Sequence, residues 1–313
     1  MQLRTSTKSG VVTRQQICDG LQAVGLKRGD AVLVHAAMRT LGRVEGGADT
    51  VVDALLETVG PAGTVVVPTF TFAHETEADP IIDPANDPSE MGAISEATRR
   101  RPAALRSTAF RHSFAAIGRR ARVITEVDPA LSPFDLRSSF GVMLALGTQV
   151  LMLGLTYSSS TSHHFAEWVC DVPYRQTQVR KVKLRRPDGS LLEQTMIDYQ
   201  PKPSTDGSYY GTRKTDFNRL GRMLEEQGKC SVGAIGNAVV RRFNMRDLID
   251  LSLVEAEKDY NVFRTEEGKT AAVDFTPLAD GRVVLSPEVA DGAHRLVRYQ
   301  WAVLDEKRLQ APA

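Results

Sequence analysis

Apolar residues recur with helical spacing near the start of the chain and then gather into a short unbroken run. Residues 13–26 carry apolar side chains three and four positions apart and open with a Thr-x-x-Gln capping-box pattern, which predicts an amphipathic helix. The apolar run over 31–37 predicts a buried strand. A second helix over 49–60 and a second strand over 61–70 follow with short links. This alternation is typical of an α/β domain.

Further elements follow from the same patterns. Helices are expected over 89–100, 161–170, 215–228 and 244–259, and strands over 111–118 and 149–155. Residues 175–199 alternate as a two-stranded ribbon does, with Pro-Asp-Gly at the turn. The predicted fold class is therefore α/β, with a central mixed sheet flanked by helices and an inserted antiparallel hairpin layer.

One domain over 1–313 is the simplest organisation. In it, 175–210 is the inserted hairpin and 266–313 is a C-terminal extension of unknown role.

Composition narrows the class of protein. The 313 residues are 42% hydrophobic and 25% charged, with a net charge of +1, so no basic excess suggests a nucleic-acid partner. No apolar run approaches the roughly 20 residues of a membrane span, and the first residues do not resemble a signal peptide. The three scattered cysteines form neither a disulfide framework nor a zinc ligand set. A cytoplasmic enzyme or binding protein, without a nucleic-acid or membrane partner, is expected.

The stretch TYSSSTSHHFAEW over 156–168 carries the strongest chemical signal. If a helix begins at Thr161, His164 and Glu167 lie three residues apart on one face. The positive end of the helix dipole disfavours an imidazolium, so the histidine stays neutral and can accept a proton. A carboxylate one turn away can fix the tautomer and stabilise the cation that forms. The pattern fits a general base that acts on an amine, an alcohol or water.

Two alternatives stay open from spacing alone. The pair could be an ordinary surface contact or a satisfied helix start. A metal-dependent hydrolase could instead use His163, His164 and Glu167, with His35 or His112 completing the ligand set in space.

Two segments could contact an anion. The strand, small-residue turn and helix over 34–50 can cradle a phosphate on backbone N–H groups, with Arg39 adding charge, although neither GxxxxGK[ST] nor GxGxxG is present. The segment 106–113 is rich in arginine, serine and histidine and offers a second anion contact. By contrast, the loop over 74–90 holds six acidic residues and no Lys or Arg, so it could attract a cationic amine.

Seven landmarks follow one another between about residue 13 and about residue 251: VLVHAAMRTLG, GGADTVVDALLETVGPAGTVVVPTFT, DPANDPSEMGAISEATRRRP, RSTAFRHSFAAIG, SPF, VLMLGL and TSHHFAEWVCDVPYR. With these landmarks in this order, the chain resembles the aminoglycoside 3-N-acetyltransferase family. No single motif decides the resemblance, but seven in order at matching spacing are highly specific.

The resemblance implies an enzyme that moves an acetyl group from acetyl-CoA to a substrate amine within a ternary complex. The catalytic residues carried over are His164, Glu167 and Thr161. The walls of the CoA site are expected at His35, Ala36, Ala37, Met38, Arg39, Arg106, Ser107, His112, Ser113 and Phe114. The substrate is expected to contact Thr69, Phe70, His74, Glu75 and Asp198, close to the inserted hairpin. No resident metal is implied, and a homodimer is left open.

The sequence also departs from the family. Ala36 and Ala37 replace the usual serines, and Ala109-Phe110 replaces a usual His-Pro. The expected CoA site therefore lacks two hydroxyl groups that the family has, and the acyl group could differ from acetyl. Acidic positions that pair with polycationic drugs fall on His74 and on the Pro-Lys-Pro of 201–203. We therefore expect the acceptor to be another small amine, such as an amino sugar or a natural-product amine with a negative charge of its own.

Overall fold

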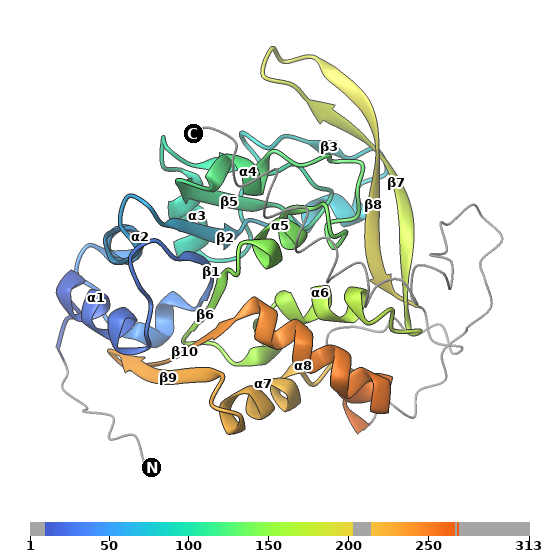
Figure 1. The fold of residues 1–313 in the computed structure, drawn as a ribbon. Helices are drawn as coiled ribbons and strands as arrows, with labels where there is room; N and C mark the ends of the chain where they lie inside the picture. Colours follow the sequence, from blue (N-terminus) through green and yellow to red (C-terminus); the bar gives the residue numbers. More distant parts are fainter. Residues whose placement is uncertain (1–9, 203–213, 267, 269–313) are drawn as a thin grey trace.

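The computed structural model describes residues 10–202, 214–266 and 268. Its centre is a seven-stranded mixed sheet with helices on both faces (Figure 1). In spatial order the strands are β4 (Leu105–Arg106), β5 (Phe114–Gly118), β2 (Thr64–Pro68), β1 (Ala31–Ala36), β6 (Gln149–Leu153), β10 (Ala238–Asn244) and β9 (Cys230–Ile235). The central strand β1 pairs in parallel with β2 and β6, and the outer pairs are antiparallel.

The helices lie between and beside these strands along the chain. The α-helices are α1 (Arg14–Ala23), α2 (Gly47–Val59), α3 (Ala93–Arg99), α4 (Ala121–Thr125), α5 (Ser139–Ala145), α6 (Ser162–Val169), α7 (Phe217–Glu226) and α8 (Met245–Lys258). The 3₁₀ turns of the described residues are η1 (Met38–Leu41), η2 (Ala73–Thr76), η3 (Tyr157–Ser159) and η5 (Tyr260–Phe263). The capping box at α1 is formed, because Thr13 N–H donates to Gln16 Oε1 over 2.9 Å and Gln16 N–H donates to Thr13 Oγ1 over 3.3 Å.

Strand β1 shows why the sheet needs helices on both faces. Successive side chains of a strand point to opposite faces. Leu33 packs with the cluster that includes residues of α5 to α8, whereas Val32 and Val34 pack with residues of α1 and α2. All three are buried, which accounts for the unbroken apolar run in the sequence.

The inserted hairpin is present as a second layer. Strands β7 (Arg175–Arg185) and β8 (Leu191–Pro201) pair antiparallel, and the short β3 (Ile81–Ile82) joins β7 in parallel. The hairpin extends away from the central sheet in Figure 1. Its first residue follows α6 closely, so the base of the hairpin lies beside that helix. The predicted fold class is confirmed.

Several details differ from the sequence prediction. The hairpin β9–β10 and the helices α4 and α5 were not predicted, and the acidic loop contains η2 and β3 rather than coil alone. The domain limits stay a prediction, and the extension beyond residue 268, like 203–210 of the hairpin, lies outside the described residues. No helix in the described part of the chain is long and apolar enough to cross a membrane. The cytoplasmic location and the homodimer also stay predictions.

Candidate active site

The candidate site begins where β6 ends. Gly154 follows the strand with φ 71°, and a Cβ there would lie 1.7 Å from Thr40 Oγ1, so only glycine fits this turn. After η3 the chain enters α6 with Thr161 at the N-cap. Within the described residues, the N–H groups of Thr161 and Ser162 and the Thr161 hydroxyl have no hydrogen-bond partner. The start of α6 therefore offers uncommitted donors.

His164 and Glu167 form a short polar contact on one face of α6. Nδ1 of His164 lies 2.6 Å from Oε2 of Glu167. The carboxylate is fully buried, and it also accepts hydrogen bonds from Tyr174 Oη at 3.0 Å and Arg175 Nη1 at 3.0 Å. Arg175 Nη1 also lies 3.1 Å from Nδ1, but the contact with the carboxylate is the shorter of the two. Because a carboxylate only accepts, we assign the imidazole proton to Nδ1 and the free lone pair to Nε2.

The charges around this pair keep the imidazole neutral. Burial lowers the pKa of His164, and the guanidinium of Arg175 lowers it further, against the opposing effect of Glu167. Burial alone would raise the pKa of the Glu167 carboxyl, but Arg175, His164 and Tyr174 outweigh it and leave that pKa below its ordinary value. At neutral pH the site thus holds a neutral histidine beside an ionised glutamate.

The neighbouring His163 has a different environment. Its side chain is fully buried, and burial lowers its pKa to about 3. The ring stacks on Phe217, and neither ring nitrogen has a hydrogen-bond partner. Across residues 10–202, 214–266 and 268, no three His, Cys, Asp or Glu side chains gather as a metal site requires. The histidine pair therefore does not act as one ligand set with Glu167.

His164 opens onto a cavity of about 280 Å³. The cavity lies between α6, the acidic loop and the base of the hairpin. Its lining residues include the aromatic and apolar Phe70, Phe72, Met91 and Pro201, the polar Ser158, Ser159, Ser160, Thr161, Gln200 and Thr215, and the titratable Glu75, Arg111, His112, His164 and Arg175.

A larger hollow lies elsewhere. Its volume is about 840 Å³, and it is lined by α1, by the turn after η1 and by the β9–β10 turn. Asp19 and Arg43 are its only charged lining residues in the described chain. Because no histidine is among the described residues that line this hollow, we assign the chemistry to the smaller cavity.

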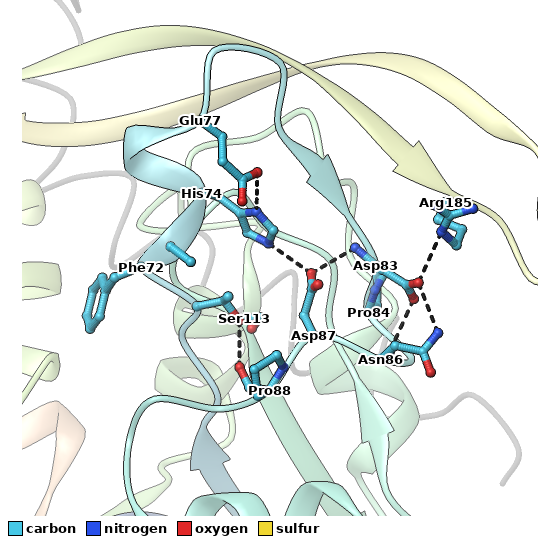
Figure 2. Close-up of polar contacts among 12 residues, drawn as sticks. Phe72, His74, Glu77, Asp83, Pro84, Asn86, Asp87, Pro88, Ser113 and Arg185 are labelled. Carbon is cyan, nitrogen blue, oxygen red and sulfur yellow. Dashed lines mark hydrogen bonds and ion pairs between the residues drawn. The ribbon is translucent and has the colours of Figure 1, made fainter.

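The residues predicted to bind substrate are only partly brought together. Phe70 and Glu75 line the cavity with His164. Asp198 is buried behind it, and Thr69 is buried with its hydroxyl 3.0 Å from that of Ser113. His74 points into the acidic loop instead, with Nδ1 3.1 Å from Glu77 and Nε2 3.0 Å from Asp87 (Figure 2). For these three residues, contact with a substrate stays a prediction.

The residues predicted to bind CoA occupy two places. His35 to Arg39 form the end of β1 and the start of η1, where burial lowers the pKa of His35 to about 4 and Arg39 is exposed. In the second segment, His112 lines the cavity.

The other members of the second segment have structural partners. Arg106 donates to the backbone carbonyls of Thr69 at 2.6 Å and Asp87 at 2.5 Å, which ties the acidic loop to the end of β2. The remaining residues of this set are buried: Ser107, Ser113 and Phe114. Their contact with the cofactor stays a prediction.

Comparison with known proteins decides the family. The family model described as aminoglycoside 3-N-acetyltransferase matches residues 33–254. Aminoglycoside N(3)-acetyltransferase VII of Streptomyces paromomycinus is 31% identical over 278 residues, which cover 80% of this chain and 93% of that protein. This chain belongs to the aminoglycoside 3-N-acetyltransferase family.

Solved structures agree with this assignment. Aminoglycoside acetyltransferase AAC(3)-Xa is 28% identical with a TM-score of 0.70, and the match covers 80% of this chain and 94% of that one. AAC-IIIb in a binary complex with CoASH is 25% identical with a TM-score of 0.70, covering 82% and 99%. Members of the aminoglycoside 3-N-acetyltransferase family are acetyl-CoA-dependent acetyltransferases. The resemblance, the enzyme class and the co-substrate predicted from the sequence are confirmed.

The sequence prediction missed Tyr174, Arg175 and Gln200 at the candidate site. Tyr174 and Arg175 contact Glu167, and Gln200 lines the cavity from β8 beside Pro201, the first residue of the Pro-Lys-Pro noted in the sequence. The first two lie in the Pro-Tyr-Arg that ends the quoted TSHHFAEWVCDVPYR landmark, so their proximity to Glu167 was a usable signal. No local pattern marks Gln200.

Proposed function

We propose that the protein transfers an acetyl or another short acyl group from acyl-CoA to the primary amine of a small molecule, with His164 as the general base. The acceptor is an aminoglycoside, an amino sugar or a natural-product amine. The supporting observation is the 2.6 Å contact between His164 Nδ1 and Glu167, in a residue that also lines a cavity. This contact leaves Nε2, which has no protein partner among the described residues, as the proton acceptor.

The base step follows from the surroundings of the ring. An aliphatic amine is mostly protonated at neutral pH, by analogy with lysine at about 10.4, and it has no lone pair for attack until it gives that first proton to solvent. The neutral amine then attacks the thioester carbonyl, and His164 takes the second proton from the nitrogen at Nε2 as the new N–C bond forms and the C–S bond breaks. Glu167 stabilises the resulting imidazolium, and the proton can then pass to the departing thiolate of CoA.

The start of α6 fits the thioester end of the co-substrate. The hydroxyls of Ser160 and Ser162 are buried without a partner in the described structure, next to the unpaired N–H groups of Thr161 and Ser162. Acetyl-CoA supplies an activated carbonyl, and these donors would hold it and stabilise negative charge as it develops on the oxygen. We assign the rest of the CoA contacts to residues 35–39 and to the 106–114 segment.

Purified protein with acetyl-CoA tests this proposal. Release of CoA thiol is measured with amino sugars, aminoglycosides and amino-acid-like amines, with and without a chelator. We expect amine-dependent release that ignores the chelator, and a loss in kcat of about 10³-fold or more in His164→Asn.

His163→Phe is the matched control, because that ring is buried away from the cavity and should leave kcat within a few-fold. Two results would contradict the proposal. Activity that dies with chelator would favour the metal-dependent hydrolase, and His164→Asn that retains every measurable property would favour a non-catalytic binding protein.

A further inference from the structure

The cavity beside His164 has a single carboxylate in its described wall, and that carboxylate is already paired. Glu75 is the only Asp or Glu among the described lining residues. Its Oε1 lies 3.0 Å from Nε of Arg111, which lines the same cavity. An ammonium group that enters here therefore meets a carboxylate whose charge is already balanced by a guanidinium.

A second carboxylate lies behind the first and is also committed. The side chain of Asp198 is fully buried, with Oδ2 3.4 Å from Arg111 Nη2 and 3.7 Å from Arg180 Nη2. Its other oxygen accepts the backbone N–H of Tyr199 over 2.9 Å. Arg111 is thus held between Glu75 and Asp198; Asp198 is buried away from the cavity, and Glu75 is paired with Arg111 through Oε1.

The guanidinium groups, by contrast, retain unused donors. Nη1 of Arg111 and Nη2 of Arg175 donate no hydrogen bond to any described residue. Nε of Arg175 is buried without a partner, in a side chain that is only 7% exposed. Because Nε is closed to solvent, it offers no donor to a ligand in the cavity, and only the terminal guanidinium nitrogens count toward binding. Both arginines line the cavity, so they can offer unpaired N–H donors and positive charge to an anion.

We infer that the acceptor carries an anionic group, a carboxylate or a phosphate, in addition to the amine that is acetylated, and that Arg111 binds this group. The inference rests on the proposed function. Arg175 already contacts Glu167, so it contributes positive electrostatic potential to the cavity and is not assigned as a direct ligand of the anionic group. Polycationic amines are disfavoured because their extra ammonium groups meet arginines and find no unpaired carboxylate among the described residues.

Two matched pairs of acceptors test the charge preference with the full chain and acetyl-CoA. Glucosamine 6-phosphate is compared with glucosamine, and lysine with cadaverine; gentamicin is the polycation. In at least one pair, we expect kcat/KM to be about ten-fold or more higher for the member that carries an anionic group, and we expect it to be lowest for gentamicin. Turnover that favours the acceptors without an anionic group would overturn this inference and leave the proposed function intact.

Substitutions at the two members of the Glu75–Arg111 ion pair should change KM in opposite directions. Arg111→Gln should raise KM for the preferred anionic acceptor about ten-fold with little change in kcat. Glu75→Gln should lower that KM several-fold, because it frees Arg111, whereas a carboxylate that binds ammonium would give the reverse. Arg180→Gln is the control, since Arg180 also pairs with Asp198 but does not line the cavity. An equal effect from Arg180→Gln and Arg111→Gln would contradict the assignment.

The experiments can show separately whether the acyltransferase proposal or the anion-site proposal is wrong. If no amine releases CoA, the proposed function is wrong, and calorimetric binding of glucosamine 6-phosphate then decides the anion site by itself. Binding to the wild type that weakens about ten-fold in Arg111→Gln would support the site, and equal or absent binding would reject it.

Discussion

The ring of His163 stacks on that of Phe217, with centroids 4.9 Å apart and planes inclined by 22°. Phe217 meets His164 as well, but edge-on, at 4.8 Å and 79°. Two adjacent histidines therefore have separate tasks: one is part of the aromatic core, and the other faces the cavity with Glu167 behind it.

His163 should make the protein sensitive to mild acid. Burial lowers the pKa of His163 to about 3, below its ordinary value of 6.5, so the unfolded chain binds more protons than the folded one once the pH falls below 6.5. Stability should then fall with pH by up to about 1.4 kcal/mol per unit for this one group. His163→Phe keeps the stacking and should reduce the slope, measured by urea unfolding between pH 7 and 5.

Other groups set the background for this measurement. His35 and His112 are also buried with lowered pKa values and contribute with the same sign, so the slope should shrink rather than vanish. The contribution of Glu167 is lost only below its ordinary pKa near 4.5, outside this range. An unchanged slope in His163→Phe would contradict the account of a neutral core histidine.

Glu167→Gln tests the tautomer of the base. A glutamine amide can donate to Nδ1, which places the imidazole proton on Nε2 and removes the free base. We expect kcat to fall by about 10³–10⁴-fold, as when a triad carboxylate becomes an amide. The measurement is CoA thiol release at saturating acetyl-CoA.

Glu167→Asp is the comparison, because it keeps a charge for Arg175 but withdraws it from His164. A shortened carboxylate should retain more activity than the amide does. Equal losses in the two variants, with thermal unfolding unchanged, would mean that losing the contact with Nδ1 costs as much as reversing it, and would contradict the tautomer account.

The fold was predictable wherever burial is strong. β1, β2 and β6 are buried on both faces and therefore read as apolar runs in the sequence. β9 is an edge strand with only Ile235 fully buried, so its apolar pattern is too weak to stand out.

The site was predictable where its residues are close in sequence. His164 and Glu167 are three apart on one helix, and helix geometry alone brings them together. The pairing of Glu75 with Arg111 joins the acidic loop to the segment before β5, and Asp198 adds the hairpin from far along the chain. The neutralisation of these carboxylates by arginine depends on tertiary contacts, which residue spacing in the sequence does not predict. The sequence therefore predicted a stronger attraction of the acidic loop for a cation than its paired carboxylates support.

Gly221 fixes how α7 packs on η3. A Cβ at this position would lie 2.0 Å from Cδ2 of the Tyr157 ring, and Tyr157 is itself held by Glu225 at 2.8 Å. Gly221→Ala should cost about 1–3 kcal/mol through overpacking, although alanine favours helix by up to about 1 kcal/mol. The free energy of unfolding in urea measures the difference.

Arg222→Ala on the same helix is the control. Arg222 is 60% exposed and lies 3.8 Å from Asp216, so its removal should change stability by no more than about 0.5 kcal/mol. A stabilised Gly221→Ala would show that the ring of Tyr157 yields at little cost.

His74 should make the protein less stable as the pH rises, which is opposite to the effect predicted for His163. Both of its ring nitrogens face carboxylates, Glu77 and Asp87, and both contacts are satisfied together only when the imidazole is protonated (Figure 2). Burial opposes the charge, but the two hydrogen bonds outweigh it and raise the pKa of His74. Its stabilisation is therefore complete below the ordinary value of 6.5 and is lost as the pH rises through the raised pKa.

The matched measurement is the cost of His74→Gln at two pH values. Glutamine keeps one donor and removes the charge, so the substitution should cost about 1.5–3 kcal/mol at pH 6 and clearly less at pH 8.5, by urea unfolding of the same preparations. Glu77→Gln should also cost more unfolding free energy at pH 6 than at pH 8.5, but by a smaller amount. The Glu77 side chain is 45% exposed, so water screens its interaction with His74. A cost that is equal at both pH values would mean that His74 is neutral in the folded protein.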